Sequence, residues 1–194
     1  MSNVAVIGAG YVGLTTAACL AHIGHNVTCA DIDEDKISQL NDGKIPIHEA
    51  RLPELIEEGL SNQLLKFVVG SQSAITTSDF VFLCLPTPQG EDGRADIGAV
   101  LEVVEEIRQL VPPQTIIINK STVPIGTNAS IETAIQRERE DISVVSNPEF
   151  LREGVAVTDF LQPDRIVIGA TNSEAGERVA ALYDPIDAPI IAVD

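Results

Sequence analysis

The sequence predicts an α/β protein built on a doubly wound, mostly parallel sheet with helices on both faces. Short apolar runs rich in Val and Ile alternate along the chain with longer segments of helical character, which is the order of a βαβ fold. The runs are apolar at successive positions, as is typical of strands that helices bury on both faces. A chain of 194 residues, 44% of them hydrophobic, is long enough to bury one large core.

Each apolar run is predicted as a strand and each intervening segment as a helix. The strands are expected at residues 4–7, 27–30, 65–69, 80–85, 115–119, 142–146 and 165–169. The helices are expected at residues 14–23, 34–41, 52–60, 97–110, 127–139 and 173–183. With right-handed crossovers this order is Rossmann-like, and ligands are expected at the carboxyl ends of the strands.

The first strand leads into a helix through a glycine-rich motif. Residues 8–13 read GAGYVG, which is a G-x-G-x-x-G pattern. Gly8 permits the tight turn, Gly10 lets the backbone approach a phosphate, and Gly13 lets the helix pack closely on the strand. Amides at a helix start, with the positive end of the macrodipole, suit a pyrophosphate. The motif therefore predicts a dinucleotide site.

The acid at the end of the second strand selects between dinucleotides. Asp31 follows the run 27–30, where a carboxylate accepts hydrogen bonds from the adenosine ribose and repels a 2′-phosphate. NAD is therefore favoured over NADP. Lys36 is expected over the adenosine end of the cofactor or, alternatively, on a helix surface. The alternative to the whole site is a plain strand-to-helix turn with Asp31 in a solvated loop, but the order of the elements favours the dinucleotide.

Charge and composition exclude several other classes. The net charge of −17 argues against a nucleic-acid partner, which needs clustered Lys and Arg. No apolar stretch approaches the ~20 residues of a membrane span, and the N-terminus has no signal-peptide pattern, so a cytoplasmic protein is expected. Cys19, Cys29 and Cys84 lie in apolar contexts without C-x-x-C spacing and are predicted to be buried, reduced thiols. No metal site is predicted.

Hydroxyl side chains follow two of the later strands. Thr87 lies between two prolines after the run 80–85, near the expected nicotinamide half, although the prolines equally suit a strand terminator. Thr122 follows the run 115–119 and is placed to orient a water or a substrate hydroxyl. On spacing alone, local backbone capping is the stronger interpretation of Thr122.

A third segment, residues 147–154, reads NPEFLREG. Glu149 and Glu153 lie four positions apart and share one face if the segment is helical, and paired acids suit proton transfer. A purely structural interpretation explains the segment at least as well: a helix cap at Asn147, a proline in the first turn and a terminating glycine. Arg165 is expected to contact a phosphate, a carboxylate of this segment or the acid beside it, and the sequence does not decide between them.

Together these segments resemble the UDP-glucose/GDP-mannose dehydrogenase family of nucleotide-sugar 6-dehydrogenases. The matching pieces occur in the order of the family, at residues 6–14, 30–33, 85–88, 120–127, 147–154 and 163–169. The last three pieces are more specific than the glycine motif. Residues 163–169 look more like the UDP-glucose branch than the GDP-mannose or UDP-N-acetylmannosamine branches.

The resemblance implies that NAD takes hydride twice from C6 of a nucleotide sugar, UDP-glucose above all, with a cysteine capturing the aldehyde and a thioester being hydrolysed. It implies that Thr122 holds a water, that Glu149 is the general base and that Glu153 orients water or contacts substrate. The implied cofactor contacts are Gly8, Gly10, Tyr11, Val12, Gly13, Asp31, Lys36, Thr87, Thr122 and Glu153. The implied substrate contacts are Glu149, Phe150, Leu151, Arg152 and Glu153.

The sequence departs from the family at the nucleophile. The family cysteine lies in a G-x-C-x-P-K-D motif, and none of the three cysteines here has that setting. The central helix and the C-terminal nucleotide-binding domain of the family are also missing from residues 1–194. We therefore expect an N-terminal NAD-binding domain that binds cofactor without the complete reaction, monomeric by itself and part of a homodimer in the whole protein. The competing function is a non-catalytic NAD-sensing domain on the same fold.

Overall fold

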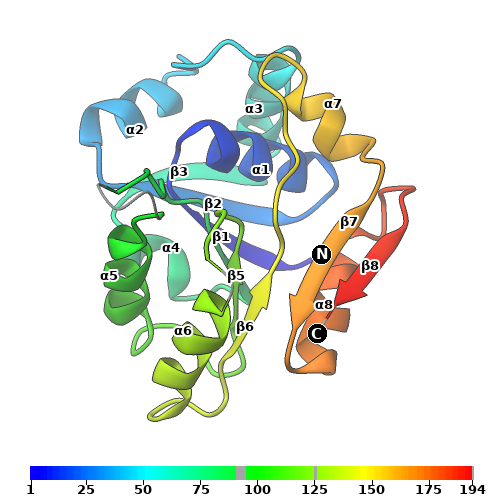
Figure 1. Ribbon diagram of the computed structural model, residues 1–194. Helices are drawn as coiled ribbons and strands as arrows, with labels where there is room; N and C mark the ends of the chain where they lie inside the picture. The colour runs from blue at the N-terminus through cyan, green and yellow to red at the C-terminus, as the bar shows by residue number, and fades with distance from the viewer. Residues whose placement is uncertain (91–94, 125, 194) are drawn as a thin grey trace.

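The computed structural model describes residues 1–90, 95–124 and 126–193, and Figure 1 shows its central sheet with helices on both sides. The strands are β1 (Asn3–Ile7), β2 (Asn26–Asp31), β3 (Leu65–Val69), β4 (Phe80–Leu83), β5 (Ile116–Asn119), β6 (Ser143–Ser146), β7 (Ile166–Ala170) and β8 (Ile190–Val193). The helices are α1 (Tyr11–His22), α2 (Glu34–Asn41), α3 (Leu52–Ser61), α4 (Gln72–Ile75), α5 (Gly98–Ile107), α6 (Thr127–Gln136), α7 (Ala156–Leu161), α8 (Ser173–Ala180) and the 3-10 turn η1 (Ala181–Tyr183).

The strand order creates a crevice beside β1. Across the described residues, the sheet runs β3-β2-β1-β4-β5-β6-β7-β8. The chain moves outward from β1 through β2 and β3, then crosses back to pair β4 on the other side of β1. Strands β1 to β6 are parallel, whereas β7 is antiparallel to β6 and β8 is parallel to β7. The reversal between β1 and β4 is where an open α/β sheet binds ligands.

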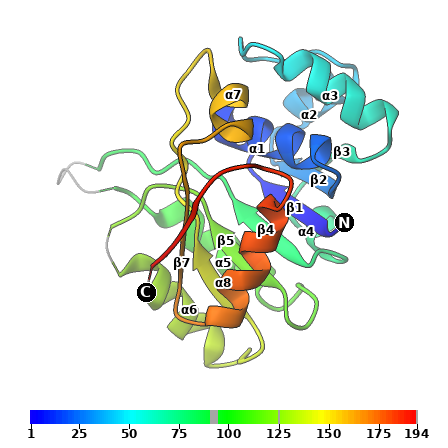
Figure 2. The same cartoon turned by 90° about the vertical axis from the view of Figure 1, so that its right-hand side faces the viewer.

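Two hydrophobic layers sandwich the sheet. In β1, Val4 and Val6 face the layer formed by α1, α2, α3, α7 and α8, whereas Ala5 and Ile7 face the layer formed by α4, α5 and α6. Figure 2 shows α1, α2, α3 and α7 together on one side of the strands. Burial on both faces accounts for the continuous apolar runs of the sequence, and each buried Leu, Ile or Phe contributes about 1.5–3 kcal/mol. The predicted fold class is confirmed.

The boundaries of several elements differ from the predictions. The first helix begins at Tyr11 rather than at residue 14, so the last glycine of the motif lies inside α1. Strand β4 ends at Leu83, ahead of two prolines that cannot donate to a sheet. The predicted helix 97–110 ends at Ile107, and 127–139 ends at Gln136. The segment 173–183 divides into α8 and η1.

Three short elements were missed by the sequence prediction. Helices α4 and α7 are only 4 and 6 residues long, too short for a helical period to emerge. Strand β8 is a run of 4 exposed residues at the edge of the sheet. Its residues, IIAV, form an apolar β-branched run like those of the other strands, so a local signal was present that the sequence prediction did not use.

Candidate functional site

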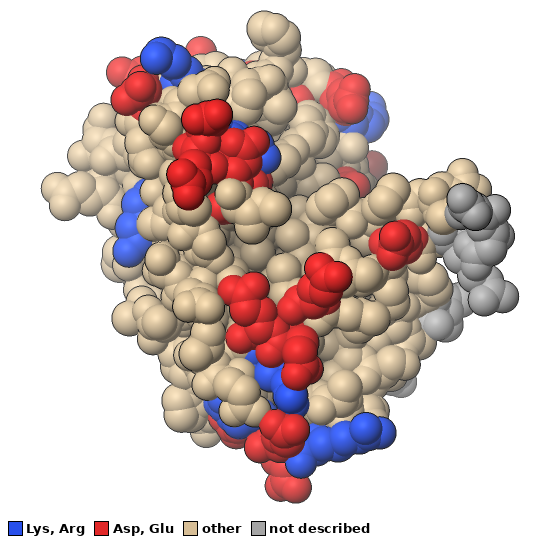
Figure 3. Space-filling view, turned by 90° about the vertical axis from the view of Figure 1, so that its left-hand side faces the viewer, with Lys and Arg blue, Asp and Glu red and all other residues tan. Residues whose placement is uncertain are grey.

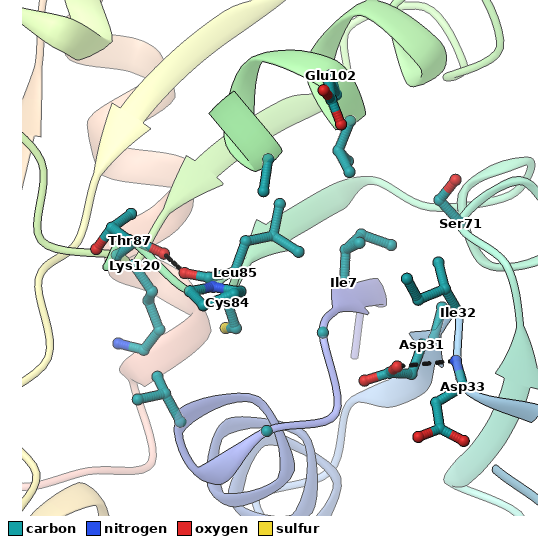
Figure 4. A pocket seen from close by; sticks show the side chains of 18 of the residues that line it. Ile7, Asp31, Ile32, Asp33, Ser71, Cys84, Leu85, Thr87, Glu102 and Lys120 are labelled. Atoms are coloured by element: carbon teal, nitrogen blue, oxygen red, sulfur yellow. Dashed lines mark hydrogen bonds between the residues drawn. The ribbon is translucent and has the colours of Figure 1, made fainter. Parts of the chain in front are cut away.

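A pocket of about 880 Å³ lies at the carboxyl ends of β1, β2, β4 and β5. This volume is within the ~300–1,000 Å³ range of small-molecule sites. Figure 4 shows Asp31 and Ser71 on one side of the pocket, with Thr87 and Lys120 on the opposite side. The pocket therefore extends from the end of β2 to the ends of β4 and β5, across the crevice beside β1.

The glycines at its centre have different roles. Gly8 has a φ of +102°, and a Cβ there would lie 2.4 Å from the Cys84 carbonyl oxygen. A Cβ on Gly13 would lie 1.7 Å from the Gly8 carbonyl oxygen. No atom of the described residues lies within 4 Å of a Cβ built on Gly10, whose φ of −83° suits any residue. The fold itself thus requires glycine at the first and third positions, whereas the space beside Gly10 belongs to the pocket.

The start of α1 is open to an anion. No side chain caps the helix at Gly10, and its first turn contains no acidic residue. The amides of Tyr11 and Val12 therefore lie at an uncapped helix terminus on the wall of the pocket. An uncapped terminus attracts negative charge through its free N–H groups and its dipole. Together with the space beside Gly10, these residues fit the diphosphate of a dinucleotide.

Asp31 ends β2 and belongs to a small hydrogen-bonded cluster. Its carboxylate accepts hydrogen bonds from the Ala9 amide at 2.8 Å, the Asp33 amide at 3.0 Å and the Lys36 Nζ at 2.9 Å. Partial burial raises the pKa of Asp31, but these donors outweigh burial and hold the pKa below its ordinary value. Asp31 is therefore an anion at neutral pH, and Lys36, on α2, is its ion-pair partner.

Further acids line the same side of the pocket. Asp33, Glu102 and Glu106 contribute to its wall, and Glu106 accepts a 2.6 Å hydrogen bond from the Ser71 hydroxyl. Figure 3 shows acidic side chains gathered in two groups on the face that carries α2 and α5. A 2′-phosphate on an adenosine ribose at this end of the pocket would meet carboxylates on both sides, and like-charge repulsion makes that arrangement unfavourable.

The opposite wall is formed by the segments that follow β4 and β5, which hydrogen bonds join to each other. The Thr87 hydroxyl donates to the Thr122 carbonyl oxygen at 3.0 Å, and the Ser121 hydroxyl donates to the Leu85 carbonyl oxygen at 2.7 Å. These bonds fix the segment after β4 to the segment after β5. Thr87 and Thr122 both line the pocket, so the structure brings these two predicted residues together.

Lys120 directly follows β5 and is only 4% exposed. Its Nζ donates to the Asn147 side-chain oxygen at 3.1 Å and lies 5.8 Å from the centre of the Phe160 ring. The Tyr183 hydroxyl donates to the same Asn147 oxygen. Burial lowers the pKa of Lys120 to about 8, although nearby acidic groups, Cys84 first, oppose the shift. Sequence reasoning included Lys120 in a motif but gave it no role; a lysine directly after a buried strand was the available signal.

The structure corrects the helical interpretation of residues 147–154. The segment has no helix, and a new helix, α7, begins only at Ala156. Asn147 is not a helix cap, because its amide donates to the Val167 carbonyl and its oxygen accepts from Lys120. The carboxylate of Glu149 accepts from the Leu151 amide, a local bond of the kind that competes with helix formation.

The two predicted acids consequently lie in different places. Glu149 lines the pocket together with Tyr11 and Thr122. Glu153 is exposed in the turn before α7 and does not line that pocket. Of the two acids predicted as a pair, only Glu149 is among the described residues that line the pocket.

The rest of the segment borders a second, smaller hollow of about 40 Å³. Phe150 and Leu151 line it, and the guanidinium of Arg165 lies 4.9 Å from the centre of the Phe150 ring. Arg152 pairs instead with Asp159 at 2.7 Å. Among the described residues, no hydrogen bond or ion pair joins Arg165 to Asp164 or to an acid of residues 147–154, and its contact is the Phe150 ring.

The three cysteines are free and buried, as the sequence predicts. Burial raises the pKa of Cys19 and of Cys84 to about 12 and also raises the pKa of Cys29. Cys84 lines the pocket, but its thiol stays protonated at neutral pH and is a poor nucleophile.

Two other kinds of feature are absent from residues 1–90, 95–124 and 126–193. No group of His, Cys, Asp and Glu side chains is arranged to hold a metal ion. No helix combines the length and apolar character needed to cross a bilayer.

The fold and the pocket define a dinucleotide-binding domain of the Rossmann class. Comparison with known proteins is more specific. The model of the UDP-glucose/GDP-mannose dehydrogenase family, NAD binding domain, matches residues 2–187. The chain belongs to this family, which confirms the predicted resemblance and identifies the cofactor as NAD.

Individual relatives of this chain belong to the same family. UDP-glucose 6-dehydrogenase TuaD of Bacillus subtilis is 42% identical over 194 residues, covering 98% of this chain and 42% of that protein. The UDP-glucose 6-dehydrogenase of Pseudomonas aeruginosa is 42% identical over 186 residues, covering 93% and 41%. This chain therefore spans less than half the length of these relatives.

Solved structures show the same fold. The UDP-glucose dehydrogenase of the archaeon Pyrobaculum islandicum superposes with a TM-score of 0.94 at 34% identity, covering 100% of this chain and 46% of that one. A GDP-mannose dehydrogenase from Pseudomonas aeruginosa superposes with a TM-score of 0.90, also at 34% identity, covering 98% and 46%.

Proposed function

We propose that this chain is the N-terminal, cofactor-binding domain of a dehydrogenase that oxidises the C6 alcohol of a nucleotide sugar, with UDP-glucose as the substrate. The observation that carries the proposal is one pocket that joins an uncapped helix start and Asp31 at one end to Thr122 and Glu149 at the other. The choice of UDP-glucose rests on relatives that are 42% identical, because the solved UDP-glucose and GDP-mannose enzymes are equally similar, at 34%.

In this proposal the residues at one end of the pocket hold the cofactor. The amides of Tyr11 and Val12 bind the diphosphate, and Gly10 leaves room for it. The anionic Asp31 accepts hydrogen bonds from the adenosine ribose, with Lys36 orienting its carboxylate. NAD, when bound, supplies the hydride acceptor.

The residues at the other end move protons and orient substrate. Thr87 and Thr122, fixed to each other by a hydrogen bond, border the nicotinamide half, and Thr122 holds a water. Glu149 is the general base that takes the proton of the substrate hydroxyl. Phe150, Leu151, Arg152 and Glu153 are proposed to contact the sugar nucleotide from the segment that surrounds Glu149.

The second oxidation requires a thiol that captures the aldehyde, and we propose that this thiol is none of the three cysteines described above. Their burial and raised pKa values support this view. In the proposal, the capturing thiol and the contacts to the nucleotide half of the substrate belong to the parts of the relatives that this chain does not match.

A chimeric enzyme tests the proposed function. Residues 2–187 replace the matching part of the Bacillus subtilis relative, and NADH formation is followed with UDP-glucose. We expect two NADH for each UDP-glucose consumed, and loss of turnover in the same chimera carrying Glu149→Gln. A folded chimera that binds NAD but forms no NADH would contradict the proposal. Unchanged turnover in the Glu149→Gln chimera would remove Glu149 as the base.

A further inference from the structure

Glu49 is a buried acid in the connection between α2 and α3, and it has no part in the function proposed above. Its side chain is 5% exposed. The carboxylate accepts three hydrogen bonds: from the Tyr11 hydroxyl at 3.0 Å, from the Gly154 amide at 2.9 Å and from the Ala156 amide at 2.7 Å. One side chain thus connects three segments that are far apart in the sequence.

Two of these segments are parts of the proposed site. Tyr11 is the first residue of α1, and its amide lies at the proposed diphosphate position. Gly154 is the last residue of the segment that carries Glu149, and Ala156 begins α7 two positions later. Helices α1 and α7 also pack against each other (Figures 1 and 2). The carboxylate therefore lies between the cofactor turn and the proposed catalytic segment.

The contact requires an ionised carboxylate at position 49, because all three of its partners are hydrogen-bond donors. A buried carboxylate is costly unless hydrogen bonds satisfy its oxygens, and every partner of Glu49 among the described residues is a donor. Burial, followed by the hydrogen bond to Glu49, raises the pKa of Tyr11, so its hydroxyl stays protonated and continues to donate. An amide in place of the carboxylate would present a donor to at least one of these donors.

We propose that Glu49 is a positioning residue that couples the dinucleotide site to the segment of residues 149–156. A dinucleotide held at the start of α1 fixes Tyr11, and Tyr11 through Glu49 holds Gly154 and Ala156. The segment that carries Glu149 is thereby ordered when the cofactor is present. This inference rests on the proposed function, because it requires NAD to occupy the start of α1.

Coupling of this kind is reciprocal. If bound NAD lowers the equilibrium constant for opening of the segment by some factor, the open form of the segment must bind NAD more weakly by the same factor. We expect a factor of about ten, which lies within the ~5–150-fold range usual for coupled sites. Two independent measurements, amide exchange and cofactor affinity, must therefore agree.

Hydrogen exchange by NMR on the 194-residue chain, with and without NAD, tests the inference alongside calorimetric titration of NAD. In the wild type, NAD slows exchange of the Gly154 and Ala156 amides about ten-fold. In Glu49→Gln, both amides exchange faster without NAD, NAD adds no protection, and the NAD dissociation constant rises about ten-fold. Glu57→Gln removes an exposed charge on the neighbouring helix α3 and behaves as wild type.

The variant Tyr11→Phe distinguishes coupling between the cofactor site and residues 149–156 from a purely structural role of Glu49. It removes the hydroxyl but leaves Glu49 its bonds to Gly154 and Ala156, so their exchange without NAD stays close to that of the wild type. Protection by NAD is expected to disappear. This variant decides the matter by itself if Glu49→Gln fails to fold.

The outcomes distinguish this inference from the proposed function. Full NAD-dependent protection in Tyr11→Phe overturns the coupling. So does a Glu49→Gln chain that opens at Gly154 and Ala156 but binds NAD with unchanged affinity, because that result marks a purely structural contact. A wild-type chain that binds no NAD overturns the proposed function first, and calorimetry alone shows it.

Discussion

Asp31 and Lys36 form a 2.9 Å ion pair in the wall of the pocket, at the end of β2. Lys36 is the one lysine among the described residues that line this end of the pocket. Its ion pair with Asp31 neutralises the charge that it would otherwise present to the adenosine end of a bound dinucleotide. It also leaves a carboxylate oriented by two backbone amides. The pocket therefore presents an acceptor, not a cation, at the position where we propose that the ribose binds.

Asp31→Asn is expected to weaken NAD binding by about 10- to 100-fold, because a hydrogen bond to a charged group contributes about 1.5–3 kcal/mol. The same change frees Lys36, so the preference for NAD over NADP should shrink. Calorimetric titration with both dinucleotides measures this, with the exposed Asp35→Asn as the control. An unaltered NAD-to-NADP ratio in Asp31→Asn would show that Asp31 does not contact the ribose.

Two glycine substitutions should have opposite effects. Gly13→Ala forces a methyl group to within 1.7 Å of the Gly8 carbonyl oxygen, and overpacking of this kind costs about 1–3 kcal/mol or more. Gly10→Ala meets no protein atom, so the free energy of unfolding should be nearly unchanged while NAD binding is lost. Urea denaturation and NAD titration of both variants measure the contrast. A stable Gly13→Ala chain, or a Gly10→Ala chain that binds NAD normally, would contradict this division of roles.

Lys120 should make stability depend on pH. Its pKa in the folded chain is about 8, against an ordinary value of 10.5. Between these pH values the unfolded chain holds the proton and the folded chain does not, so this group's contribution to the free energy of unfolding rises with pH. The rise amounts to about 3 kcal/mol.

Urea denaturation of the wild type and of Lys120→Met at pH 7 to 10.5 isolates this contribution. The buried thiols and tyrosines titrate in this range only in the unfolded chain, and because both variants contain them their contribution cancels in the difference. The stability of the wild type relative to Lys120→Met should increase from about pH 8 upward. A difference that stays flat with pH would mean that the ammonium group is not desolvated.

The cysteines should be chemically inert in the folded chain. Burial raises the pKa of Cys84 to about 12, so little thiolate exists at pH 8, and the thiolate is the reactive form. Reaction with a disulfide reagent should be at least ~100-fold slower in the native chain than in urea, because a pKa three units above that of an ordinary thiol lowers the thiolate fraction by about 1,000-fold. Fast reaction of Cys84 with the reagent in the folded chain, located by mass spectrometry, would contradict this prediction and would show that Cys84 can act as a nucleophile.

Local patterns predicted the fold and the glycine turn that follows β1. The glycines of residues 8–13 and the acid Asp31 have roles determined by strand, turn and helix, all of which are adjacent in the sequence. Continuous apolar runs such as β1 follow from burial on both faces of the sheet. These features depend on neighbours along the chain, so the sequence alone was sufficient.

The structure of residues 147–154, where we propose the catalytic base, was less predictable because long-range contacts determine it. Residues 147–154 have spacing that suits a helix, yet Asn147 is fixed by Lys120 and by the Val167 carbonyl. Gly154 has a φ of +87° and bonds to Glu49, 105 positions away. No local pattern contains such partners, and Glu49 itself was indistinguishable from an ordinary loop acid.

The central claim is that the start of α1 binds the diphosphate of NAD. Amide NMR spectra of the ¹⁵N-labelled chain, recorded during titration with NAD, test it most directly. We predict that the Tyr11 and Val12 amides show the largest shifts and saturate together with the Ala9 amide, which bonds to Asp31. Saturable binding that leaves these amides unmoved, or no binding at millimolar NAD, would contradict the account.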